Sequence, residues 1–94
     1  MIFVKDMALT FEDFKRGLPA AMAGLDYMID GTTVRTGDTE KGITITVKPL
    51  PARVLGGLLR VERSEVRIVF RGYGEAESSG FMDRFDRSYQ RGGG

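Results

Sequence analysis

The sequence predicts an α+β domain in which an antiparallel sheet of three to four strands carries an N-terminal and a C-terminal helix on one face, in the order α-β-β-β-β-α. Two observations favour this class. Apolar and polar residues alternate over residues 43–48 and again over 58–73, as in strands with one buried face. Near both ends of the chain, apolar residues recur at helical spacing instead. Each helix and the sheet then has one apolar side, and packing both helices on the sheet buries these sides together.

Length and composition indicate one domain spanning residues 1–94. The chain has 41% hydrophobic and 29% charged residues, which is usual for a folded protein of this size. It contains no cysteine and no histidine, which excludes disulfides, thiol nucleophiles, the usual zinc sites and histidine proton shuttles. We therefore expect no catalytic residue, no cofactor and no metal, and an enzyme is the least favoured class of function.

The first helix is predicted to begin after Thr10. This residue can act as N-cap, with Asp13 in the capping-box position. Pro19 removes a helical N–H, so we expect a kinked helix or two short ones, ending near Gly24. The preceding segment, 1–9, is expected to be either an edge strand or loosely attached. The apolar residues at helical spacing are Phe11, Phe14, Leu18, Met22 and Leu25.

Two β-prone segments follow. Residues 26–36 contain an Asp-Gly turn dipeptide and predict either one bulged strand or a small hairpin. Residues 43–48 alternate cleanly and predict a strand with isoleucine and valine facing inward. Pro49 and Pro51 are expected to end this strand, and the residues up to Gly57 are expected to form a connector.

The segment 58–73 is predicted to be a β-hairpin with its turn at 62–65. Leu59 and Val61 would then face inward on the first strand. On the outer face, Arg60 would lie directly opposite Arg67, where two like charges repel each other.

The last helix is predicted to follow a polar linker at 75–80, with Ser78 or Ser79 as N-cap. Phe81, Phe85 and Tyr89 are spaced to pack this helix on the sheet. The three glycines at 92–94 are expected to form a flexible tail.

Charge is unevenly distributed although the net charge is only +1. Residues 43–73 carry six basic and two acidic side chains, whereas the segments on either side are net negative. This predicts a basic outer face on the sheet, which either binds an anionic group or partner or is simply solvated. The candidate residues of this face are Lys48, Arg60, Arg67, Arg71 and Tyr73.

These features favour a small interaction or accessory protein that acts through surface contacts. The alternative is binding of nucleic acid or a phosphorylated ligand on the basic face, which has little aromatic support because Tyr73 is its sole candidate for stacking. Free sheet edges and the Ile2-Phe3-Val4 run make a homodimer a further expectation. The N-terminus is unlike a signal peptide and no stretch is long enough to span a membrane, so a cytoplasmic location is expected.

Overall fold

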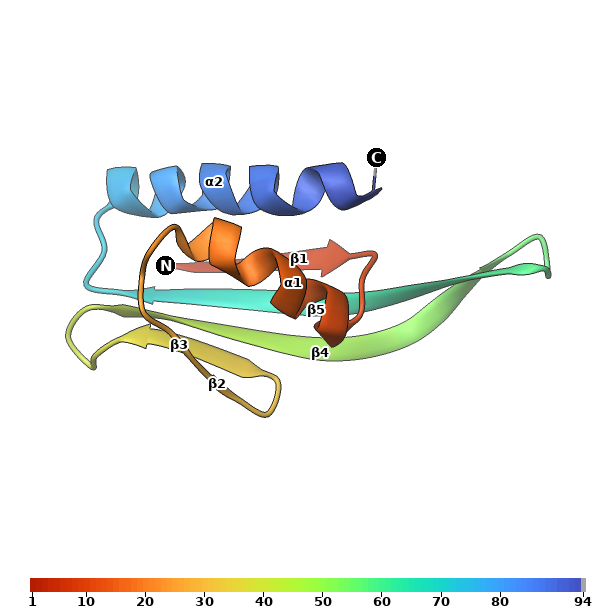
Figure 1. Cartoon of the computed structure of the whole chain (residues 1–94), viewed down its shortest axis with the longest axis horizontal. Coiled ribbons are helices and arrows are strands. Elements are labelled where there is room, and N and C mark those ends of the chain that lie inside the picture. Colours follow the sequence, from red (N-terminus) through yellow and green to blue (C-terminus); the bar gives the residue numbers. More distant parts are fainter. Residues whose placement is uncertain (94) are drawn as a thin grey trace.

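The computed structural model describes the backbone of residues 1–93 and the side chains of residues 1–89. Five strands form one antiparallel sheet, and two helices pack on one of its faces (Figure 1). The sheet order is β1-β5-β4-β3-β2. The predicted α+β class is confirmed, and a strand in front of the first helix completes the sheet. The elements are β1 (Ile2–Met7), α1 (Phe11–Met22), β2 (Met28–Asp30), β3 (Thr33–Gly37), β4 (Gly42–Leu55), β5 (Leu59–Arg71) and α2 (Glu75–Gly93).

The N-terminal segment is an edge strand, which is one of the two predicted alternatives. β1 pairs with β5 over its whole length, from Ile2 opposite Val69 to Met7 opposite Ser64. Of the two alternatives predicted for segment 26–36, the structure shows the small hairpin: β2 pairs with β3, and Asp30 lies opposite Thr33.

Helix α1 begins with the predicted capping box. The Asp13 N–H donates to Thr10 Oγ1 at 3.2 Å, and the Thr10 N–H donates to the Asp13 carboxylate at 3.4 Å. The helix is continuous from Phe11 to Met22 and is not divided at Pro19. It ends at Ala23, whose left-handed backbone places its N–H on the Pro19 carbonyl at 3.1 Å.

The prediction that two prolines end the strand at residue 48 is wrong, because β4 continues to Leu55. The Val47 N–H donates to Thr32 O at 3.0 Å, toward β3. The nitrogen of Pro49, two residues further along β4, faces the same side. The pairing of β3 with β4 does not reach this position, so the missing N–H of Pro49 costs no hydrogen bond to β3, and the bonds to β5 are unaffected. Pro51 lies within a register shift between Leu50 and Arg53, where the ladder is interrupted in any case.

The predicted hairpin turn at 62–65 is also wrong. These residues lie inside β5, which pairs with β4 through a turn at Gly56 and Gly57. With no reversal at 62–65, alternation places Leu59 and Val61 on the side opposite Val66 and Ile68. Leu59 is accordingly exposed rather than inward-facing.

Helix α2 begins at Glu75, so the predicted linker at 75–80 is helical. Ser78 is fully buried and donates to the Gly74 carbonyl at 2.9 Å, instead of capping the helix. Of the predicted tail, 92 and 93 continue the helix, and residue 94 lies outside the described residues.

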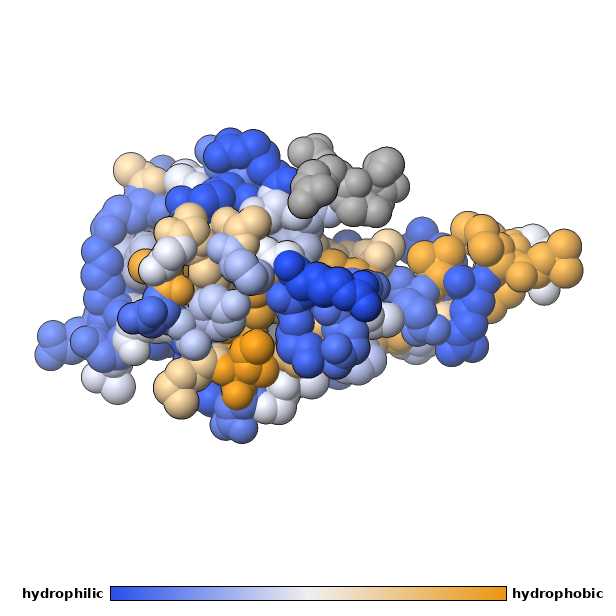
Figure 2. Space-filling view, in the orientation of Figure 1, coloured by the Kyte–Doolittle hydropathy of each residue, from blue (hydrophilic) through white to orange (hydrophobic). Residues whose placement is uncertain are grey.

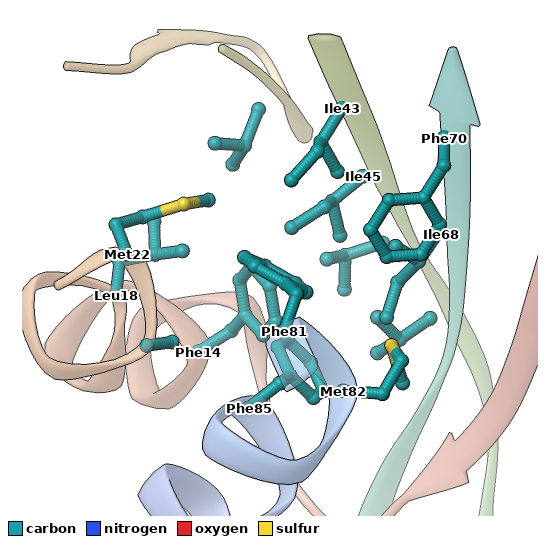
Figure 3. Close-up of a cluster of buried hydrophobic side chains, with 14 residues drawn as sticks. Phe14, Leu18, Met22, Ile43, Ile45, Ile68, Phe70, Phe81, Met82 and Phe85 are labelled. Atoms are coloured by element: carbon teal, nitrogen blue, oxygen red, sulfur yellow. The ribbon is translucent and has the colours of Figure 1, made fainter. Parts of the chain in front are cut away.

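The core lies between the two helices and the inner face of the sheet (Figure 3). The Tyr89 hydroxyl donates to the Phe14 carbonyl at 2.7 Å, which links α2 to α1. Burial raises the pKa of this phenol. The buried residues drawn and labelled in Figure 3 are Phe14, Leu18, Met22, Ile43, Ile45, Ile68, Phe70, Phe81, Met82 and Phe85.

Candidate functional site

The distal halves of β4 and β5 leave the body of the protein as a two-stranded ribbon, residues 50–63, which we call the arm (Figure 1). The neighbouring strands do not extend along it: β3 begins opposite Thr46, and β1 ends opposite Ser64. The arm makes the molecule elongated, with extents of 47 × 25 × 21 Å. A two-stranded ribbon has no core of its own, so its side chains remain available for contacts.

The tip of the arm is a tight turn surrounded by aliphatic side chains. Gly56 and Gly57 have φ values of +61° and +74°, and the Leu58 N–H donates to Leu55 O at 3.2 Å. Leu58 is 97% exposed. Figure 2 shows the hydrophobic surface at the end of the arm. The exposed aliphatic residues here, called the tip below, are Val54, Leu55, Leu58 and Leu59.

Arg63 fixes the base of the arm to the body. Its guanidinium donates to the Asp6 carboxylate of β1 at 2.5 Å and to the Pro51 carbonyl at 3.0 Å. These contacts join the edge strand to both strands of the arm. The arm is therefore held at a defined angle at its base while its tip stays free.

Charged side chains on the arm are largely paired with each other or with the body. Arg60 donates to the Glu62 carboxylate at 3.0 Å, and both side chains are more than half exposed. With Arg63 engaged by Asp6, Arg53 is the one arm cation without an ion pair among the described residues. The arm therefore ends in aliphatic side chains, and few of the positive charges next to them are available to bind an anion.

The structure does not bring the five predicted face residues together. Lys48 lies opposite Glu65, and Arg67 lies opposite Thr46, on the sheet face that carries no helix. Arg60 pairs with Val54 in the arm. Because Arg60 and Arg67 belong to one strand at an odd separation, they face opposite sides, and the predicted repulsive pair does not exist.

Arg71 is held within its own surroundings. It donates to Thr44 Oγ1 at 2.7 Å and to the Asp38 carbonyl at 3.0 Å. The Asp38 carboxylate accepts the N–H groups of Lys41 and Glu40, both at 2.9 Å, and these bonds lower its pKa. The guanidinium therefore helps to order the β3–β4 loop.

Tyr73 turns to the helix side of the sheet. The chain reverses at Gly72, with a φ of +70°, and the ring packs 5.3 Å from the ring of Phe70. Lys41 lies 5.0 Å above it and forms a 2.6 Å ion pair with Glu77, which raises the pKa of Lys41 and lowers that of Glu77. Tyr73 therefore lies on the opposite side of the sheet from Lys48 and Arg67.

Sequence reasoning missed the arm, although a signal was present. The Gly56-Gly57 dipeptide stands between two aliphatic pairs, an arrangement typical of a two-residue hairpin turn. A turn at 62–65 fits the same pattern, because it would pair Val61 with Val66 and Leu59 with Ile68 in a self-consistent register.

Within the described part of the chain, no cluster of three or more acidic, histidine or cysteine side chains could hold a metal ion. No helix there has the length and apolar character needed to cross a membrane. Comparisons of the chain with protein-family models, with curated proteins and with solved structures found no significant match.

Proposed function

We propose that this protein is a small non-enzymatic interaction protein, and that its arm is the part that contacts a partner protein. The observation that carries the proposal is the exposure of Leu58 at the end of a projecting ribbon. Isolated exposed leucines are common, but four large aliphatic side chains around one turn form a patch of the kind found at interaction sites.

The charge pattern supports a protein partner over nucleic acid or an anionic membrane. Both of those need several free cations, since each neutralised phosphate or lipid headgroup contributes a modest share of the affinity. On the arm, Arg60 and Arg63 are already in ion pairs. The remaining attraction is the burial of aliphatic surface, which an apolar pocket on a protein provides.

The arm suits insertion into such a pocket. Burying one leucine side chain is worth about 1.5–3 kcal/mol, and a few centrally buried residues dominate most interfaces. The contacts of Arg63 with Asp6 and Pro51 hold the base of the ribbon before binding, which reduces the entropy lost on association.

A photo-crosslinking amino acid at position 58 tests the proposal, with the same group at Leu25 as the control. Leu25 is also exposed, but it follows α1 in the body of the protein. We expect position 58, and not position 25, to form a discrete adduct with one protein from the native host. That protein, purified, should bind the unmodified chain, and Leu58→Ser should weaken binding by at least ~10-fold while Leu25→Ser leaves it unchanged.

Equal adducts at both positions, or equal affinity of the two serine variants, would refute the arm as the contact. The same variants should be titrated with anionic vesicles and with duplex DNA at low salt. Binding to either that depended on Leu58 would replace the protein partner by a membrane or a nucleic acid.

A further inference from the structure

The outer edge of β1 presents unpaired backbone groups. The Phe70 N–H donates to the Met1 carbonyl at 3.0 Å, so the backbone N–H and C=O groups of the odd-numbered residues of β1 point toward β5. The N–H and C=O groups of Ile2, Val4 and Asp6 therefore point away from the sheet. No strand lies on that side within the described residues, because β1 is the end of the sheet.

This edge lacks the features that usually prevent strand pairing. β1 is six residues long, contains no proline and keeps a regular register with β5. Its two charges are already paired, Lys5 with Asp86 at 2.9 Å and Asp6 with Arg63. The opposite edge, β2, is protected by being three residues long. A long, regular and charge-neutralised edge is a site for pairing with another strand.

We propose that β1 pairs with β1 of a second copy of this chain, antiparallel, around a twofold axis that passes Val4. Val4 then lies opposite Val4 of the second copy, and Ile2 lies opposite Asp6. In such pairs each residue exchanges both of its hydrogen bonds with its partner. This register satisfies every outward-pointing N–H and C=O group of the edge.

Side chains agree with this register. Ile2 and Val4 lie on the sheet face without helices, and both are about half exposed. The twofold places the two Val4 side chains next to each other on this face, with Ile2 of each copy two residues away along its own strand, so these four aliphatic side chains form one line across the junction. Symmetric pairing of identical surfaces is the commonest arrangement of soluble oligomers. A second copy presents an edge of the same length with the same outward-pointing groups and the same aliphatic side chains, which makes it the better occupant.

The test is the molecular mass in solution by sedimentation equilibrium, from about 1 µM to about 1 mM. The wild-type chain is expected to approach twice 10.4 kDa as concentration rises. Val4→Pro removes the central outward N–H without breaking a bond to β5, and it should raise the dissociation constant by at least ~10-fold. Val4→Thr keeps this donor and the β-branched shape, and should dimerise like the wild type.

Hydrogen exchange gives a readout that does not depend on the variants. The amides of Val4 and Asp6 should become protected as concentration rises, whereas those of Phe3 and Lys5, which face β5, should be protected throughout. A monomer at every concentration, or unaltered dimerisation of Val4→Pro, would overturn the inference.

The tip of the arm takes no part in the proposed pairing of the two β1 strands. Leu58→Ser should leave the dimer intact. A dimer that survived Val4→Pro and dissociated in Leu58→Ser would show that the arm, and not β1, joins the two copies.

Discussion

Replacing Gly17 by alanine should destabilise the protein, although alanine is the better helix former. In an exposed helix interior this change stabilises by about 1 kcal/mol. Here a Cβ atom at Gly17 would lie 2.4 Å from Cε1 of Tyr89 and 2.9 Å from its Cζ, far inside van der Waals contact. The absence of a side chain at Gly17 therefore leaves the space in which the Tyr89 ring of α2 packs against α1.

The Tyr89 ring cannot move aside freely. It is stacked on Phe14 at 5.1 Å with an interplanar angle of 1°, and it contacts Phe85 at 4.8 Å. Its hydroxyl is bonded to the Phe14 carbonyl. Overpacking of this kind costs about 1–3 kcal/mol. After the gain of about 1 kcal/mol in helix propensity, the expected net loss is up to about 2 kcal/mol, and each kcal/mol lowers Tm by about 4–8 °C.

A double-mutant cycle measured by urea unfolding separates the two effects. In a Tyr89→Ala background the clash is absent, so Gly17→Ala should stabilise by up to about 1 kcal/mol. The coupling energy between the two sites should then equal the cost of the clash, about 1–3 kcal/mol. Stabilisation of the otherwise unaltered chain by Gly17→Ala would show that the helices are not locked together at this point.

Three further predictions concern the core, pH and the arm. Phe85→Ala empties a fully buried site and should cost about 3–5 kcal/mol, leaving the chain largely unfolded by circular dichroism; an unchanged melting temperature would contradict the packing of α2. Because the pKa of Tyr89 is raised in the folded state, the stability from its protonated form is complete below the ordinary value near 10 and declines as pH rises above it. Urea unfolding between about pH 9 and 11 should show this decline, and Tyr89→Phe should lessen it. Leu58→Ser should change the free energy of unfolding by less than about 0.5 kcal/mol, and a larger loss would mean that the tip packs against the body.

Periodicity predicted the packed body of the protein well. Ile43, Ile45 and Val47 were expected to face inward, and all three are buried. The capping box at Thr10 and the burial of Phe85 followed from local sequence as well. These features depend on residues near each other in the chain, so a pattern of a few positions is enough to reveal them.

The errors arose where a residue's effect depends on its neighbours in the sheet. Pro49 would end the strand only if a neighbouring strand needed its missing N–H. Here the nitrogen points to the side of β4 where β3 no longer pairs. Residues 62–65 are polar like a turn, yet Ser64 is buried and donates to the Leu9 carbonyl at 2.9 Å. With the turn at Gly56-Gly57, Arg60 and Arg67 lie on one strand and face opposite sides, so the predicted pair of opposed arginines does not form.

The position of β5 between β1 and β4 has a consequence for the order of folding. Contacts between β4 and β5 are local and are closed by a short turn, so this hairpin can form early. β1 is made first but pairs with β5 near the other end of the chain, with Ile2 opposite Val69. It therefore has no place in the sheet until residue 69 has left the ribosome, and loop closure over this distance slows its docking. The first strand to be synthesised is the last that can complete the sheet.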